Sequence, residues 1–310
     1  MNKYEYSYHD HFFIFYIVLG STLLLLNLQA MLVIQRSKCL WILSGYRLIF
    51  FGCAADAVNC AVQIVAVVVT LRTPVIHPTT NMFLGALNHG SYSAGCPIIL
   101  ALSVNRLVAV VFPKKMNLMF DRKKTRQILI LCWLFGVFTC ALCLSGEIRM
   151  LWDPCVPKFY YTNESSFVAI FTRTLDLYFG EFVCIASFII YLTIIVVLLC
   201  DRQRIHSVRV ELPLLFHSFQ VFAISGISLY LWFYSLSDSI HYRHAINSFV
   251  IFRFGVAPVS LIITNRTYRR KMFACKHYLL GTTNTVECWA VQPQTNVQGR
   301  KKCQSYVTNF

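Results

Sequence analysis

The chain has 310 residues, of which 57% are hydrophobic and only 13% are charged, and its formal net charge is +15. Its mean hydropathy is +0.58, whereas roughly a quarter of the residues in a soluble domain are charged. This composition excludes a soluble globular protein and predicts an integral membrane protein.

Seven apolar runs are long enough to cross the hydrocarbon core of a bilayer, which takes about 20 helical residues. In chain order they are residues 12–34, 48–71, 82–104, 128–145, 177–200, 212–236 and 245–264. Because lipid offers no partners to backbone N–H and C=O groups, each run must form a helix. The runs do not alternate in polarity, which excludes a β-barrel. The sequence therefore predicts an all-α bundle of seven transmembrane helices.

Basic residues gather in alternate gaps between these runs. The gaps after the first, third and fifth runs, together with the tail, hold 21 of the 28 Lys and Arg residues. Residues 300–302 lie too far from a span to count, which leaves 18 against six on the other face. Lys and Arg accumulate on the cytoplasmic side, so we expect the N-terminus outside and the C-terminus inside. This charge matches anionic membrane lipid and not nucleic acid.

The same pattern divides the chain into three parts. Residues 1–11 are expected to form a short extracellular N-terminus, 12–264 the bundle, and 265–310 a cytoplasmic tail that begins with a short amphipathic helix. The sequon at Asn163 lies in an outer loop and is the expected glycosylation site, whereas the sequon at Asn265 faces the cytoplasm. Cys275, after a basic stretch, is either palmitoylated or a plain buried thiol.

Three charged residues fall within the apolar runs, where a charge is costly and points to function. Asp56 could act as a switch in the bundle interior, or form a hydrogen-bonded node with Asn27 and Asn59. Glu181 lies about one helical turn inside the fifth run and is either a pocket residue or a carboxylate in contact with headgroup water. Arg253 lies on the order of 12 Å deep, and Glu181, Asp56 or an anionic ligand group could neutralise it.

Aromatic residues, including Trp232, crowd the outer end of the sixth run, and residues 159–161 add three more in an outer loop. They form either an interfacial belt or a lid over a ligand pocket that also takes Asn88, His89 and Tyr92 from the third run.

Signatures of catalysis and metal binding are weak. His241 and His244 are two ligands without a third, which makes a poor metal site, and no cofactor is expected. The sequence has no phosphate-binding loop, no His-Glu-x-x-His and no Gly-x-Ser-x-Gly motif, so we expect no catalytic residues and no enzyme activity.

The third run continues through Asn105-Arg106 to Pro113, which resembles the Asp-Arg-Tyr signature and following proline of rhodopsin-like G-protein-coupled receptors. Further positions that resemble this superfamily are Asn27, Asp56, Trp133 and Pro258. Asn105 in place of the acidic residue, Ala257 before the last proline, and the stretch 211–220 are similar to nematode serpentine chemoreceptors of class x or the related class t.

This resemblance implies a receptor that binds a small molecule from outside and activates a heterotrimeric G protein. The switch and G-protein-coupling positions that it implies are Asn105, Arg106, Pro113, Asp56 and Pro258, and the helix-packing positions are Asn27 and Trp133. Because Asn105 removes an ion pair that would restrain Arg106, we expect elevated basal activity. Position 81 holds Asn where most relatives have a cysteine, which leaves Cys155 without its usual disulfide partner.

A transporter or ligand-gated channel is the alternative function. In that case Asp56, Glu181 and Arg253 would line a continuous polar path. Both functions place the chain in the plasma membrane as a multi-pass protein, and the family resemblance adds the sensory cilium as a possible site.

Overall fold

The computed structural model describes residues 3–72, 76–153, 158–162, 166–201, 212–234 and 239–279. The chain divides into two units, Met1–Met272 and Phe273–Phe310. The first unit contains the helical bundle, and of the second the described part is the end of one helix. Asn163 and Cys155 lie outside the described residues, so the glycan and the unpaired cysteine stay predictions.

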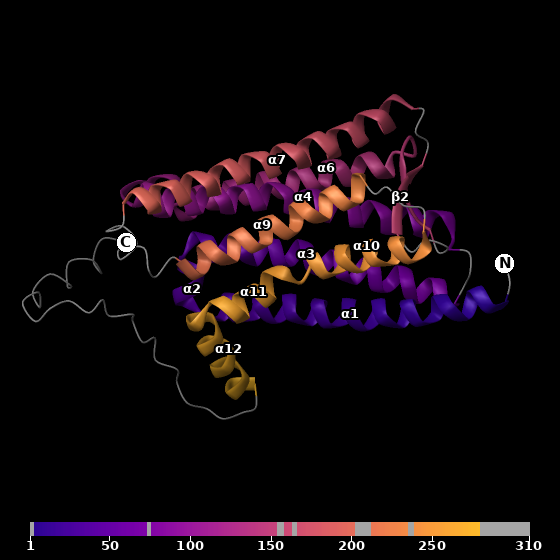
Figure 1. The fold of residues 1–310 in the computed structure, drawn as a ribbon, viewed down its shortest axis with the longest axis horizontal. Coiled ribbons are helices and arrows are strands. Elements are labelled where there is room, and N and C mark those ends of the chain that lie inside the picture. Colours follow the sequence, from indigo (N-terminus) through magenta and orange to yellow (C-terminus); the bar gives the residue numbers. More distant parts are fainter. Residues whose placement is uncertain are drawn as a thin grey trace, which may run out of the picture. The chain divides into compact units, whose positions relative to one another are not determined.

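Six helices in the described part of the chain are long and apolar enough to cross a membrane. They are α1 (Lys3–Arg36), α3 (Ser44–Arg72), α4 (Pro78–Val111), α6 (Arg122–Leu144), α7 (Phe167–Cys200) and α9 (Leu212–Phe233) (Figure 1). The seventh predicted span consists of α10 (Ile240–Arg253) and α11 (Val256–Thr264), which are bent by 57° at their junction. The shorter helices are α2 (Lys38–Ile42), the 3₁₀ turn η1 (Pro113–Lys115), α5 (Met116–Met119) and α12 (Arg266–Leu279).

Local sequence signals set several helix ends. The Asp121 side chain caps α6 by accepting a 2.6 Å hydrogen bond from the Lys124 amide, and Ser166 caps α7 in the same way. Side-chain acceptors of this kind satisfy the unpaired N–H groups of a first helical turn. Helix α4 ends at Val111, one residue before Phe112, because Pro113 disfavours helical backbone in the residue that precedes it.

The break between α10 and α11 follows from Pro258. Proline has no N–H, so the Phe254 carbonyl four residues earlier loses its helical donor. The Asn27 amide on α1 replaces that donor, with a 2.7 Å hydrogen bond to the Phe254 carbonyl oxygen. Asn27 therefore joins α1 to the bent span at the point where the span is broken.

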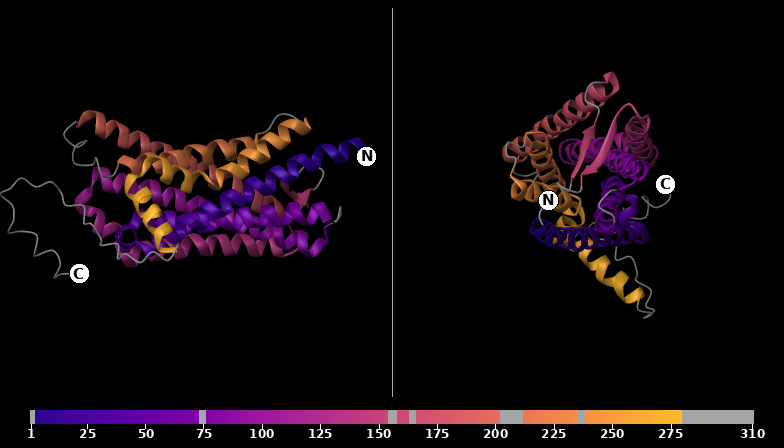
Figure 2. Two further views of the ribbon diagram at one scale, coloured as in Figure 1. Left: turned by 90° about the horizontal axis from the view of Figure 1, so that it is seen from below. Right: turned by 90° about the vertical axis from the view of Figure 1, so that its right-hand side faces the viewer.

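Helix α4 occupies the centre of the bundle, in contact with α3, α6, α7 and α9. Figure 2 shows the long helices running side by side, with two short strands crossing one end. Gly90 of α4 and Gly136 of α6 bring the two backbones close together, as small residues do in membrane bundles.

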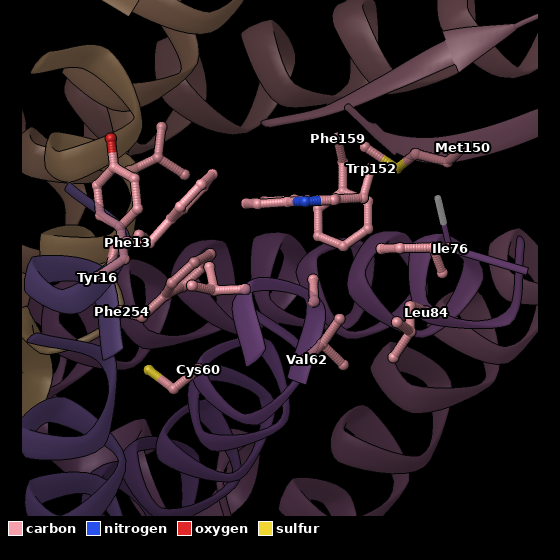
Figure 3. Close-up of a cluster of buried hydrophobic side chains, with 14 of the residues drawn as sticks. Phe13, Tyr16, Cys60, Val62, Ile76, Leu84, Met150, Trp152, Phe159 and Phe254 are labelled. Carbon is pink, nitrogen blue, oxygen red and sulfur yellow. The ribbon is translucent and has the colours of Figure 1, made fainter. Parts of the chain in front are cut away.

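The two strands form an antiparallel hairpin that the sequence analysis did not anticipate. Strand β1 (Arg149–Asp153) pairs with β2 (Lys158–Thr162). Met150, Trp152 and Phe159 point from the hairpin into the same apolar cluster as Phe13 and Phe254 (Figure 3). We call this end of the bundle the hairpin end and the opposite end, which carries Arg106, the Arg106 end.

Candidate functional site

A cavity of about 40 Å³ lies inside the hairpin end of the bundle. It is lined by Gln63, Asn88, His89, Tyr92, Met150, Asp176, Ser228, Leu229, Trp232, Phe233, Val250, Arg253 and Phe254. These residues come from five helices and the hairpin, so the cavity exists only when the whole bundle is assembled.

Five of the six pocket residues predicted from the sequence meet in this cavity. They are Asn88, His89, Tyr92, Trp232 and Arg253. The sixth, Glu181, lies elsewhere on α7, where its carboxylate accepts a 2.6 Å hydrogen bond from the Tyr234 hydroxyl. Because α7 begins at Phe167, Glu181 lies well inside the helix and not one turn from its start, and it is half-buried.

The Arg253 guanidinium is 6% exposed and is held by polar and aromatic neighbours. Its Nε donates to the Ser225 hydroxyl at 3.2 Å, and its Cζ lies 4.8 Å from the Tyr92 ring centroid and 5.3 Å from that of Phe254. Within the described residues it forms no ion pair with Glu181 or Asp56, and Nη1 is buried without a hydrogen-bond partner. Cation–π contacts thus stabilise the guanidinium, and of the candidates from the sequence only an anionic ligand group is left to neutralise it.

Tyr161 of β2 connects the hairpin to the cavity. Its hydroxyl donates to Asp176 at 3.0 Å and lies 3.2 Å from His89 Nδ1. Burial, together with the neighbouring Asp176, raises the pKa of Tyr161 well above its usual value, so the hydroxyl keeps its proton. Because that proton points to Asp176, His89 must donate its Nδ1–H to the Tyr161 oxygen, which leaves Nε2 as an acceptor.

A side-chain clasp holds the hairpin on the bundle. The Asn81 side-chain amide donates to the Trp152 carbonyl at 3.1 Å, and its oxygen accepts from the Trp152 backbone N–H at 2.7 Å. The Trp152 indole N–H also donates to the Thr70 hydroxyl at 3.0 Å. Asn81 thus provides a non-covalent attachment of β1 to α4.

Replacing Asn81 by alanine should loosen the hairpin. The change leaves the Trp152 backbone N–H and C=O unpaired, at about 1–3 kcal/mol for each buried group. We expect a lower midpoint of thermal unfolding for the purified protein, with Asn81→Asp in between because it keeps one acceptor. Thr80→Ala, at an exposed position on the same turn, is the control. Equal midpoints for Asn81→Ala and Thr80→Ala would show that the clasp contributes nothing.

A second cavity lies deeper in the bundle, below the first. Its lining includes Asp56, His217, Ser225, Arg253 and Ala257, so Arg253 borders both cavities. The hydrogen-bonded node predicted for Asp56 is not formed, because the Asn27 and Asn59 amides donate to backbone carbonyls instead. Pro258 is buried beside this region in α11.

The Arg106 end contains a buried polar cluster. Arg106 is 2% exposed and its guanidinium donates to the Asn105 side-chain oxygen. The Asn105 amide in turn donates to the Ser44 hydroxyl at 2.9 Å. Gly45 faces this cluster, and an added Cβ there would overlap the Arg106 guanidinium. Asn105 therefore restrains Arg106 through a hydrogen bond, although it cannot form the ion pair of an acidic residue.

Trp133 of α6 lies apart from both cavities. It borders an open cleft of about 690 Å³ between α6 and the α2–α3 region, together with Trp41, Phe51 and Arg126. The helix-packing role of Trp133 stays a prediction.

Comparison with known families decides what kind of bundle this is. The sequence model described as serpentine type 7TM GPCR chemoreceptor Srx matches residues 17–212. The chain belongs to the Srx family of serpentine chemoreceptors. A comparison with curated proteins finds no match.

Among solved structures, the crystal structure of squid rhodopsin matches this Srx chain with a TM-score of 0.73 and 11% sequence identity. The match covers 88% of this chain and 87% of squid rhodopsin. At this identity the similarity establishes the fold, which is the seven-helix bundle of a rhodopsin-like receptor.

The polar cavity residues of the Srx chain that the sequence analysis did not include are Gln63, Asp176 and Ser228. Gln63 follows Asp56 by two helical turns on the same face, which was a usable signal. Asp176 was assigned to an outer loop because residues 167–176 contain several polar side chains, but α7 begins at Phe167 and includes it.

Proposed function

We propose that this chain is a chemosensory G-protein-coupled receptor that binds a small molecule at the hairpin end and activates a heterotrimeric G protein at the Arg106 end. The family already makes it a serpentine receptor of the GPCR type. The observation that supports ligand binding is the cavity between α3, α4, α7, α9 and α10, whose apolar lining is interrupted by a few polar side chains.

The arrangement of Arg253 supports communication between the ends. Arg253 borders the ligand cavity and also the deeper cavity that contains Asp56. It lies directly before the break in the seventh span, where Pro258 and Asn27 shape the backbone. A ligand that binds Arg253 differently in two bundle arrangements would shift their populations.

At the Arg106 end the proposal assigns G-protein coupling to a basic residue that is held inside the bundle. Arg106 is buried against Asn105, so it must leave this position to reach a G-protein segment. Such an exchange of partners is a two-state element of the kind that receptor switching requires. Pro113 ends α4 just beyond this site and positions the following basic turn.

The orientation, modifications and location of the receptor are part of the same proposal. The hairpin end is assigned to the outside on the distribution of basic residues, which leaves Asn163 outside and Cys275, in α12, inside. A plasma-membrane receptor in a sensory cilium fits the family. Asn265 is buried and bonded to the Tyr46 hydroxyl at 2.7 Å, so a glycan there would disrupt this contact.

The alternative of a transporter or channel lacks a shared polar path. Asp56 and Arg253 border one cavity, but Glu181 borders neither of the two cavities described above. We therefore favour the receptor.

The test is a reporter assay in cells that express the receptor with a matched G protein, screened with volatile and water-soluble compounds. We expect compounds that activate the wild type to give no response with Arg106→Ala, because the coupling cation is gone. Surface labelling controls for delivery. A response that survives Arg106→Ala, or a ligand-evoked current without G protein, would contradict the proposal.

A further inference from the structure

The cavity at the hairpin end contains buried polar atoms that have no hydrogen-bond partner in the described part of the chain. They are Gln63 Oε1, Asn88 Oδ1, His89 Nε2 and Arg253 Nη1. All four side chains are less than a tenth exposed and all line the same cavity. Buried polar atoms in proteins almost always have partners, so four unpartnered atoms around one space indicate a ligand that supplies them.

These four atoms separate into two chemical kinds. The amide oxygens of Gln63 and Asn88 can only accept hydrogen bonds, and His89 Nε2 also accepts because Nδ1 donates to Tyr161. The three acceptors come from α3 and α4. Arg253 Nη1 can only donate, and it comes from α10. A matching ligand therefore carries donors on one side and an acceptor on the other.

The charges around the cavity restrict this ligand further. Among the lining residues, Arg253 brings a positive charge and Asp176 a carboxylate. Because these formal charges balance, a ligand with a net charge would leave one charge uncompensated in a buried site, which is unfavourable. A ligand that carries one positive and one negative group avoids this penalty.

Arg253 is prepared to bind an anionic group. Ser225 holds its Nε, and the rings of Tyr92 and Phe254 lie close to its guanidinium. A planar guanidinium fixed in this manner loses little freedom when it binds a carboxylate.

We propose that the cavity binds small zwitterionic amino acids. The carboxylate bonds to Arg253 Nη1, and the ammonium group donates to the acceptors of Gln63, Asn88 and His89, near Asp176. This inference rests on the ligand-binding role proposed above and specifies its chemistry. The free volume of about 40 Å³ accommodates roughly three water molecules, which favours the smallest amino acids.

The test measures binding to the purified full-length receptor in lipid nanodiscs through its midpoint of thermal unfolding. The probes are L-alanine, propionate, which lacks the ammonium group, and ethylamine, which lacks the carboxylate. We expect L-alanine to reach half of its stabilising effect at a concentration at least about tenfold below either fragment, because each fragment loses a charge-assisted hydrogen bond.

Variants assign the effect to the cavity. With Arg253→Gln, L-alanine and ethylamine should reach half of their stabilising effects at the same concentration. With Arg253→Lys, L-alanine should still act at a lower concentration than ethylamine, but by a smaller factor than in the wild type. With Asn88→Leu, the ratio between the half-effect concentrations of propionate and L-alanine should be smaller than in the wild type. Arg72→Gln, an exposed arginine at the end of α3, is the matched control and should behave as the wild type. If Arg253→Gln does not fold, the titrations of Arg253→Lys and Asn88→Leu still show whether L-alanine binds in this cavity.

Several results would overturn the inference. Equal half-effect concentrations for L-alanine and propionate would show that the cavity has no ammonium site. If glycine, L-alanine and L-serine all fail to stabilise the receptor, the cavity is not an amino-acid site. The receptor function is judged separately, by nucleotide exchange on a purified G protein. Exchange evoked only by compounds without a carboxylate overturns the amino-acid site alone, whereas amino-acid binding without exchange overturns only the receptor function.

Discussion

Replacing Gly90 or Gly136 by alanine should markedly destabilise the receptor, whereas the same change at Gly95 should not. A Cβ added at Gly90 would lie 2.8 Å from the Gly136 carbonyl oxygen and 2.7 Å from the Cys140 Cβ. A Cβ added at Gly136 would lie 2.5 Å from the Gly90 carbonyl oxygen and 2.7 Å from the Ala94 Cβ. Both clashes involve backbone or Cβ atoms, so α4 and α6 must separate to make room.

The sign of the effect distinguishes close packing from helix propensity. Alanine is about 1 kcal/mol more favourable than glycine inside a helix, so a glycine without a packing role should become more stable when it is changed. Nothing lies within 4 Å of a Cβ added at Gly95, and this position is the matched control. At Gly90 and Gly136 we expect overpacking of about 1–3 kcal/mol to exceed the gain.

Thermal unfolding of the three purified variants measures the change in stability. Surface labelling in cells measures how much of each variant reaches the cell surface. We expect lower unfolding midpoints and less receptor at the surface for Gly90→Ala and Gly136→Ala. Unchanged midpoints at these two positions would show that the α4–α6 contact is looser than the structure describes.

The helices could be predicted because lipid requires them. An apolar run of bilayer length has no alternative to a helix, so the span predicted at residues 12–34 lies within α1. The predictions were poorest where polar residues extend a helix beyond the apolar run. Phe167 begins α7 ten residues before the predicted span, and this extension carries Asp176 into the cavity.

The hairpin could not be predicted with the same means. Each strand has five residues, and its pairing depends on contacts with α4 that lie far away in the sequence. The sequence of β1 does not alternate in polarity, because Leu151 between Met150 and Trp152 is also apolar, and the alternation appears only in the burial of the folded strand. The role of Asn81 depends on this hairpin and was therefore also missed.

The candidate site was partly visible in the sequence. A charge in an apolar run, such as Arg253, is conspicuous because of its cost. Its neighbours depend on how each helix is rotated about its own axis, which a hydropathy pattern does not determine. Tyr92 therefore lines the cavity, whereas neither Asp56 nor Glu181 pairs with Arg253, whose guanidinium lies over aromatic rings.

Replacing Asn105 by alanine should raise the ligand-independent activity of the receptor. Asn105 joins two elements, since its oxygen accepts from the Arg106 guanidinium and its amide donates to the Ser44 hydroxyl. In this arrangement Arg106 is buried and unable to contact a G protein. A hydrogen bond to a charged group is worth about 1.5–3 kcal/mol. Its loss should therefore raise the ratio of active to resting receptor by roughly tenfold or more.

Nucleotide exchange on a purified G protein, in the absence of ligand, measures this population. We expect a several-fold rise in exchange for Asn105→Ala and a fall below the wild-type rate for Asn105→Asp, because an ion pair would restrain Arg106 more strongly. Ser44→Ala removes only the outer hydrogen bond and should give a smaller rise. Each rate is compared with that of Arg106→Ala, which sets the background.

The three substitutions distinguish a specific restraint of Arg106 by Asn105 from a general loss of packing at the Arg106 end. A general loosening of the Arg106 end would raise exchange for Asn105→Asp as well as for Asn105→Ala, since both changes disturb the bond to Ser44. Opposite effects of the two substitutions can arise only through the charge next to Arg106. Equal rates for Asn105→Ala and the wild type would mean that the hydrogen bond does not hold the receptor in its resting arrangement.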